Sequence, residues 1–218
     1  MTAGGPSVVP PWQEMSTEFA RALADRATDP GGRRWLFVPY DQLSDAMGPL
    51  SREEPEDLGI VVVENPWKAA HRPYHRQKLA LVLANLRHFA LEQAARGVAV
   101  RHVVARGPYR SALRPLALEL GPIRVMRPAE RELRSDLAPM VAEGGLVELP
   151  HEGWLTSTED FVESQKHGSP PYRMDAFYRA VRRRTGILME DARPMGGKYS
   201  FDAENRRPWK GSPPAPDL

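Results

Sequence analysis

The chain contains no cysteine among its 218 residues. Disulfides, thiolate nucleophiles, thiolate zinc sites and cysteine-ligated iron–sulfur clusters are therefore excluded within these residues. The six histidines form no HExxH or two-histidine-one-carboxylate pattern. One pair, His71 and His75, has helical spacing, but Pro73 lies between its members. The sequence therefore predicts no metal site.

Long apolar runs are also missing. No stretch approaches the ~18–20 apolar residues that a bilayer-spanning helix needs, and the N-terminus lacks the apolar core of a signal peptide. A cytoplasmic protein with no membrane contact is the resulting expectation. The formal net charge is only +2, so no overall electrostatic attraction to DNA is expected and any contact would be local.

Glycine-rich phosphate-binding motifs are absent as well. No GxGxxG follows an apolar run, and neither GxxxxGK[ST] nor the GxSxG nucleophile turn occurs. Dinucleotide binding, P-loop chemistry and serine hydrolysis therefore have no support.

The chain does have a regular alternation of short apolar runs with amphipathic segments. The predicted strands are Trp35–Val38, Gly59–Val63, Val98–Val104, Ile123–Met126 and Leu146–Leu149, and the predicted helices between them are Tyr74–Arg96, Tyr109–Leu120 and Ala129–Glu143. Buried runs that alternate with helices are typical of a parallel sheet. We therefore predict an α/β fold, a Rossmann-like parallel sheet of about five strands with helices on both faces. Pro115 and Pro139 are expected to break or kink their helices.

The flanking regions differ from this α/β pattern. Residues 1–32 suggest a tail and a weak helix over Met15–Ala27, and residues 33–150 form the α/β domain. Residues 151–211 are predicted to be a helical C-terminal extension and connector without strands, with helices at Ser157–Gln165 and Arg173–Thr185. Residues 212–218 have the composition of a tail.

Polar and aromatic residues follow the first two predicted strands. Tyr40, Asp41 and Gln42 come after the first, and Glu64, Trp67 and Lys68 after the second. Ligands of open α/β sheets bind at the carboxyl ends of the strands, so these residues are the candidates for a binding crevice. Asp41 and Glu64 could accept hydrogen bonds from a ligand. Asp41 alternatively caps the turn after its strand.

Two features mark the C-terminal part. The arginine cluster 179, 182, 183 and 184 suits either a solvated helix face, which the small net charge favours, or contact with DNA phosphates or an acidic partner. The segment from Gly196 to Trp209 is too aromatic for a free linker. Tyr199 and Phe201 are therefore predicted to pack onto the α/β domain or the Arg173–Thr185 helix.

Three segments, in consistent order, carry a resemblance to a known family. They are the DQLS turn at Asp41–Ser44, the helix YHRQKLALVLANLRHFA at Tyr74–Ala90, and the string from Tyr172 to Trp209 that contains GGKYSFDAENR. Together they resemble the photolyase-related family, the iron–sulfur bacterial cryptochromes and photolyases. The resemblance covers Arg33 to Trp209.

The resemblance implies the N-terminal α/β domain of such a protein. In the family, light excites a reduced flavin in a helical C-terminal domain, and an electron passes to damaged pyrimidines. The N-terminal domain harvests light and supports the fold. We therefore expect this chain to lack the flavin and iron–sulfur domain, to carry no catalytic residue, FAD or cluster, and to act with a separate flavin-binding photolyase-like chain. Any link to DNA repair or photoreception would then be indirect.

The resemblance also implies a ligand. Many members bind an antenna chromophore, typically a ribityl-lumazine, near these loops. The matching positions are Tyr40, Asp41, Gln42, Glu64, Trp67, Lys68 and His75. Two of them depart from the family, because Tyr40 stands where glycine is usual and Lys68 where an acidic residue is usual. A tyrosine ring could fill the space that glycine leaves for a flat ligand.

Two other functions remain open. One is a small-molecule enzyme that uses Asp41 and Glu64 as acid and base, which would require both carboxyls in one pocket with raised pKa values. The other is a non-catalytic interaction domain whose pocket is closed by Tyr40.

Overall fold

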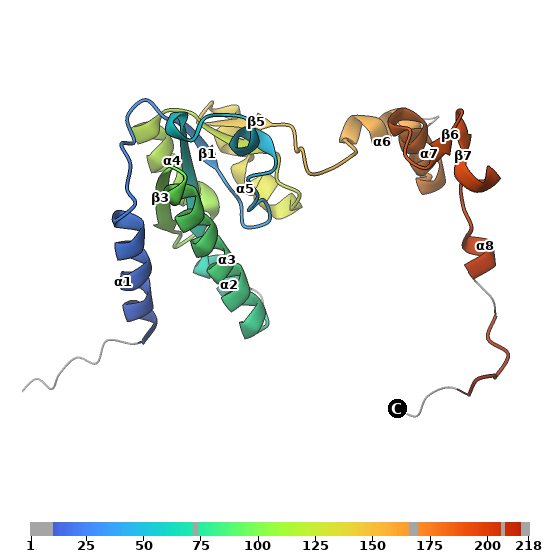
Figure 1. The fold of residues 1–218 in the computed structure, drawn as a ribbon, viewed down its shortest axis with the longest axis horizontal. Coiled ribbons are helices and arrows are strands. Elements are labelled where there is room, and N and C mark those ends of the chain that lie inside the picture. Colours follow the sequence, from blue (N-terminus) through green and yellow to red (C-terminus); the bar gives the residue numbers. More distant parts are fainter. Residues whose placement is uncertain (1–10, 72–73, 166–169, 206–207, 215–218) are drawn as a thin grey trace, which may run out of the picture. The chain divides into compact units, whose positions relative to one another are not determined.

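The structure is a computed structural model that describes residues 11–71, 74–165, 170–205 and 208–214. Within these ranges the side chains of residues 11–17, 204 and 205 are not described. The chain divides into two compact units, Met1–Gly153 and Trp154–Leu218. Figure 1 shows both units. Among the described residues, no helix combines the length and apolarity needed to span a bilayer.

The first unit contains a five-stranded sheet in the order β3-β2-β1-β4-β5, and all four neighbouring pairs are parallel. The strands are β1 (Arg34–Phe37), β2 (Leu58–Glu64), β3 (Ala99–Val104), β4 (Ile123–Met126) and β5 (Leu146–Leu149). The apolar runs predicted as strands are confirmed, as is the Rossmann-like α/β class. β2 is buried along its whole length, as expected of a central parallel strand.

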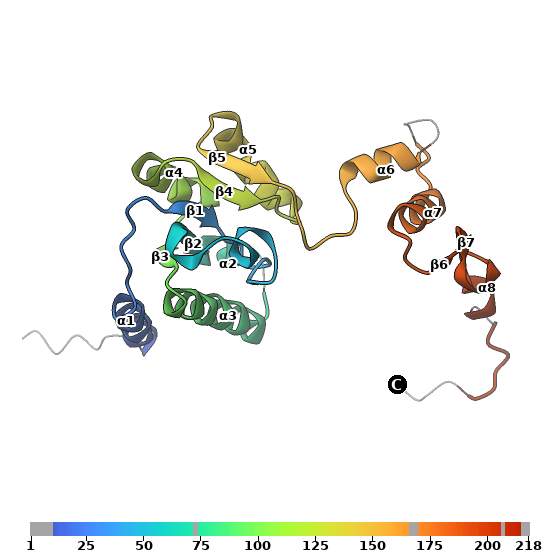
Figure 2. The same cartoon turned by 45° about the horizontal axis from the view of Figure 1, so that its top comes forward.

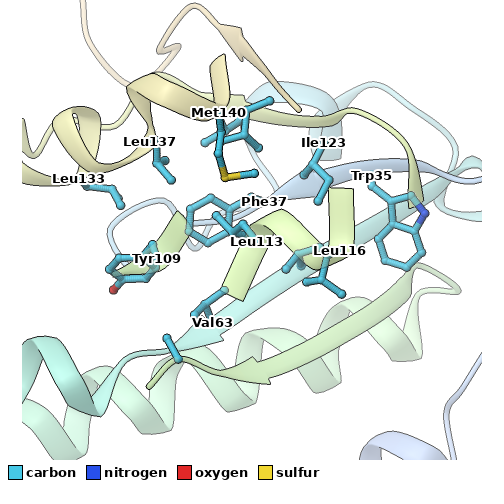
Figure 3. Packing of buried hydrophobic residues seen from close by; sticks show 14 of the residues in the cluster. Trp35, Phe37, Val63, Tyr109, Leu113, Leu116, Ile123, Leu133, Leu137 and Met140 are labelled. Carbon is cyan, nitrogen blue, oxygen red and sulfur yellow. The ribbon is translucent and has the colours of Figure 1, made fainter. Parts of the chain in front are cut away.

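Helices cover both faces of the sheet, as the sequence predicts (Figure 2). They are α1 (Pro11–Ala24), α2 (Pro66–Ala70), α3 (Arg76–Ala95), α4 (Tyr109–Leu120) and α5 (Arg131–Ala142). α4 and α5 pack on one face through Leu113, Leu137 and Met140, as Figure 3 shows. α1 and α3 pack on the other through Phe19 and Leu86. The central strands β1 and β2 therefore send alternate side chains into two separate cores.

The expectation that Pro115 breaks its helix was wrong. α4 continues through Pro115, and α5 continues through Pro139. Both prolines are exposed, whereas Leu113 and Leu116 of α4 are buried on the sheet. Tertiary packing of the apolar face on either side of the proline therefore outweighs the one lost backbone hydrogen bond.

The second unit contains strands, which the sequence did not predict. Its elements are α6 (Thr158–Ser164), α7 (Met174–Thr185), β6 (Met189–Glu190), β7 (Arg193–Pro194), a 3-10 turn at Met195–Gly197 and α8 (Asp202–Asn205). β6 and β7 form an antiparallel pair. The two residues between them, Asp191 and Ala192, have φ values of 46° and 63°, the backbone of a tight hairpin turn. Such turns usually contain glycine, so the composition concealed this one.

Arg182 lies at the centre of the second unit and is 5% exposed. Its guanidinium donates hydrogen bonds to the backbone oxygens of Leu188 and Tyr199 and lies 5.2 Å from the centre of the Tyr199 ring. The predicted packing of Tyr199 onto the Arg173–Thr185 helix is therefore confirmed. Phe201 instead lies against Gly196, where an added Cβ would come within 2.8 Å of its ring.

Candidate functional site

A pocket of about 300 Å³ opens at the carboxyl ends of β1 and β2. α2 and the first half of α3 form its other walls. Most of its lining is aliphatic or aromatic. The lining residues are Tyr40, Val63, Glu64, Asn65, Pro66, Lys68, Ala69, Tyr74, Lys78, Leu79, Val82, Leu83, Leu86 and Tyr109. The volume lies at the lower end of the range of about 300–1,000 Å³ for small-molecule sites.

Glu64 provides the buried charge of this pocket. Arg87 Nε donates to Glu64 Oε1 at 2.5 Å and Arg87 Nη2 to Oε2 at 2.9 Å, while His102 Nε2 lies 3.0 Å from Oε1. Burial opposes ionisation of the carboxyl, but the hydrogen bonds from His102 and Arg87 prevail and lower the pKa of Glu64 to about 2. Glu64 is therefore a fixed carboxylate that only accepts hydrogen bonds.

Tyr40 and Lys68 also line the pocket, and both contact Glu130, which follows β4. Lys68 Nζ pairs with Glu130 Oε2 and lies 5.4 Å from the centre of the Tyr40 ring. Tyr40 Oη donates to the same Glu130 oxygen at 3.4 Å. Burial and the negative charge of Glu130 raise the pKa of Tyr40 to about 12. Tyr40 is thus a neutral side chain. Its hydrogen bond to Glu130 connects the loops after β1 and β4, the neighbouring strands between which the strand order reverses.

Two more tyrosines complete the aromatic lining. Tyr109 is 7% exposed, lies 6.0 Å from Phe37 between ring centres, and burial raises its pKa. Tyr74 lies just before α3, and its ring centre is 5.6 Å from Lys78 Nζ. The described residues supply no carboxylate partner for Lys78, so this exposed ammonium group leaves a positive charge among the lining residues.

Three of the seven residues implied by the family resemblance line this pocket, namely Tyr40, Glu64 and Lys68. Asp41 is exposed. Gln42 is buried, and its amide donates to the backbone oxygen of Met126 at 3.1 Å, which ties the end of β1 to β4.

The remaining two candidates lie outside the pocket lining. Trp67 is 38% exposed and lies against His71, with 4.1 Å between ring centres and an interplanar angle of 47°. It lines a neighbouring crevice of about 270 Å³ with Arg110 and Asp136. His75 caps α3, where its Nδ1 accepts from the backbone N–H of Gln77 at 3.3 Å.

Sequence reasoning missed Arg87 and His102, the two partners of Glu64. A signal for His102 was present, because Glu64 and His102 have the same parity on neighbouring parallel strands and so point to the same face. Arg87 directly follows Leu86, one of the apolar residues through which α3 packs on the sheet. Neither signal identifies a contact until the strand order is known.

The acid/base alternative does not fit this geometry. It requires Asp41 and Glu64 in one pocket with raised pKa values, whereas Asp41 does not line the pocket and the pKa of Glu64 is lowered. That hypothesis was wrong for this pair. Across the described ranges, no three histidine, aspartate or glutamate side chains group closely enough to hold a metal ion.

The parallel sheet and its crossovers define a Rossmann-like α/β domain, with a pocket at the strand ends where such folds bind their ligands. The chain belongs to the deoxyribodipyrimidine photo-lyase-related protein family, whose model matches residues 36–218. It is 30% identical over 181 residues to a protein named (6-4) photolyase from Agrobacterium fabrum (strain C58 / ATCC 33970). That alignment covers 79% of this chain and 36% of the relative, so the chain spans little more than a third of the relative's length.

Proposed function

We propose that the first unit is an antenna-type domain of a photolyase-related protein, and that its strand-end pocket holds a flat heterocyclic chromophore of the ribityl-lumazine type. The observation that supports this proposal is the composition of the pocket. Apolar and tyrosine side chains surround one fixed carboxylate, and this combination suits a planar ligand with polar edges.

Each wall has a part in this proposal. The aliphatic side chains of α3, such as Val82 and Leu83, would contact one face of the ring system. Glu64 would accept hydrogen bonds from ring N–H groups or ribityl hydroxyls, because a carboxylate held by Arg87 and His102 still has free lone pairs. Lys78, which lacks a described acidic partner, would meet a ring carbonyl oxygen.

The wider role follows from family membership. We propose that excitation energy collected here passes to a flavin-binding photolyase-like unit, which carries out the light-driven chemistry on DNA. The relative named (6-4) photolyase supports a connection with photolyase chemistry. In this proposal the first unit binds the chromophore and has no catalytic residue, and its connection to DNA is indirect.

The test is a fluorescence titration of a ribityl-lumazine with the full chain. Tyr40→Gly is expected to raise the affinity, because it removes a ring from the pocket wall. Tyr40→Phe is the matched control and should bind like the wild type, since it keeps the ring and loses only the weak 3.4 Å hydrogen bond to Glu130. If none of the three proteins binds at ligand concentrations up to about 1 mM, the proposal is contradicted. A dissociation constant of that size corresponds to a binding free energy of only about 4 kcal/mol.

A non-catalytic interaction domain is the second candidate. It is favoured by the way Glu130 and Lys68 hold the Tyr40 ring in the pocket wall. In this case neither the wild type nor Tyr40→Gly should bind the lumazine, and the residues that line the pocket would have only a structural role.

A further inference from the structure

Helix α1 precedes the residues that the family model matches, which begin at residue 36. It nevertheless packs on the same face of the sheet as α3. A cavity of about 440 Å³ lies between α1, α3 and β3, so α1 does not cover the sheet continuously. Phe19, which is 9% exposed, is its most deeply buried described side chain.

The Phe19 ring lies against two charged or polar side chains. It meets the His102 ring edge-on at 5.0 Å between centres, with an interplanar angle of 84°. The guanidinium carbon of Arg87 lies 5.4 Å from the Phe19 ring centre, within the range of a cation–π contact. These two side chains are also the ones that hold Glu64.

A continuous set of contacts therefore runs from α1 to the pocket. Phe19 touches Arg87 and His102, both bind the Glu64 carboxylate, and Glu64 lines the strand-end pocket. An ion pair gains strength where water is excluded, and its long side chains lose fewer alternative rotamers when a ring fixes them. The Phe19 ring supplies both effects from outside the pocket, since neither Phe19 nor any other described side chain of α1 lines it.

We propose that α1 stabilises the pocket through Phe19. In this proposal Phe19 is a positioning residue, which fixes the Glu64 carboxylate by holding Arg87 and His102. The effect on ligand affinity rests on the proposed function, whereas the effect on the Glu64–Arg87 pair does not. The Arg87 side chain is 24% exposed with the ring in place. Without the ring, more of the guanidinium meets water and the carboxylate loses its single orientation. The pocket then presents a mobile acceptor to its ligand.

A purely structural role for Phe19 makes a different prediction, and α1 contains the control needed to separate the two. Leu23 lies four residues further on the same helix, so it shares the face of Phe19 and packs against the same apolar core. Loss of α1 packing alone would affect both positions alike. Loss of the ring over the ion pair is specific to Phe19.

The experiment compares the full chain with Phe19→Ala and Leu23→Ala by two measurements. The first is the solvent exchange rate of the Arg87 Nε–H proton by NMR, which needs no ligand. The second is the affinity for a ribityl-lumazine by fluorescence. We expect Phe19→Ala to speed the exchange about tenfold and to weaken binding about five- to tenfold, in line with the loss of a cation–π contact. Leu23→Ala should leave both within about twofold.

Equal exchange rates in Phe19→Ala and the wild type would overturn the proposed positioning role of Phe19. An equal acceleration of exchange in Leu23→Ala would overturn it as well. If Phe19→Ala fails to fold, Phe19→Leu replaces it, because leucine keeps an apolar cover but has no ring. Faster exchange in that variant supports the proposal, and unchanged exchange overturns it. If neither the wild type nor the two Tyr40 variants bind the lumazine, the proposed function is refuted, and the Arg87 exchange rate then tests the role of Phe19 by itself.

Discussion

At the scale of single residues, the ionisation of Glu64 links the pocket to the stability of the fold. The carboxyl is 6% exposed and still has a pKa lowered from 4.5 to about 2. A group whose pKa is lower in the folded state stabilises that state above its unfolded pKa. This contribution is lost as the pH falls from about 4.5 towards 2.

Replacing Glu64 by glutamine should therefore remove part of the acid sensitivity. Between pH 5 and pH 2 the wild type should lose about 3 kcal/mol more of its unfolding free energy than Glu64→Gln, at about 1.4 kcal/mol per pKa unit. Urea denaturation at a series of pH values measures both slopes. Parallel curves for the two proteins would show that Glu64 is not the group that titrates.

Gly59 provides a second prediction at this scale. It faces Trp35 across the β1–β2 pair, and a Cβ at this position would lie 2.6 Å from the indole ring. Gly59→Ala should therefore cost about 1–3 kcal/mol of unfolding free energy through overpacking. Gly145→Ala is the control, since its nearest neighbours would be 3.7 Å away. Chemical denaturation that finds the two variants equally stable would be inconsistent with the predicted clash.

At the scale of elements, sequence reasoning succeeded where apolar periodicity decides the structure. The run Ile60–Val63 is buried on both sides, as its continuous β-branched composition predicts for a central parallel strand. The hairpin β6–β7 could not be predicted, because Asp191 and Ala192 take positive φ values without the glycine that usually marks such a turn. The pocket charges could not be predicted either, since Arg87 and His102 meet Glu64 only after the strand order brings them together.

The same element-scale reasoning predicts the effect of losing Arg182. Its guanidinium donates to the backbone oxygens of Leu188 and Tyr199, and the Leu188 oxygen also accepts from the N–H of Met195. Arg182→Ala should therefore deprive the part-buried Tyr199 oxygen of this donor and cost about 1–3 kcal/mol. Amide hydrogen exchange at Met189 and Met195, whose N–H groups form backbone hydrogen bonds, would report this loss. Arg183→Ala is the matched control. Arg183 neighbours Arg182 in the sequence but is exposed, so its loss should change the unfolding free energy by no more than about 0.5 kcal/mol. Equal protection in the two variants would contradict a central role for Arg182.

At the scale of the whole molecule, the division into two units has a direct consequence for proteolysis. Trp154 and Leu155 are 59% and 65% exposed at the start of the second unit. Chymotrypsin should cut there first, and the fragment from residue 1 to this point should unfold cooperatively by itself, because both apolar cores of the sheet belong to it. A fragment with no cooperative transition would mean that the first unit needs the second in order to fold.

The strand order also determines when each strand can pair with its neighbours during synthesis on the ribosome. β1 can pair with β2 soon after both emerge, but its other edge is covered only by β4, which begins 86 residues after β1 ends (37 to 123). At about 5–20 residues per second, a nascent chain would leave the backbone groups of that edge unpaired for about 4–17 s. A strand edge open for so long is a site for aggregation. Trigger-factor-like chaperones that bind apolar nascent segments should therefore raise the yield of this protein when they are supplied during cell-free translation, and should raise it much less when they are added afterwards.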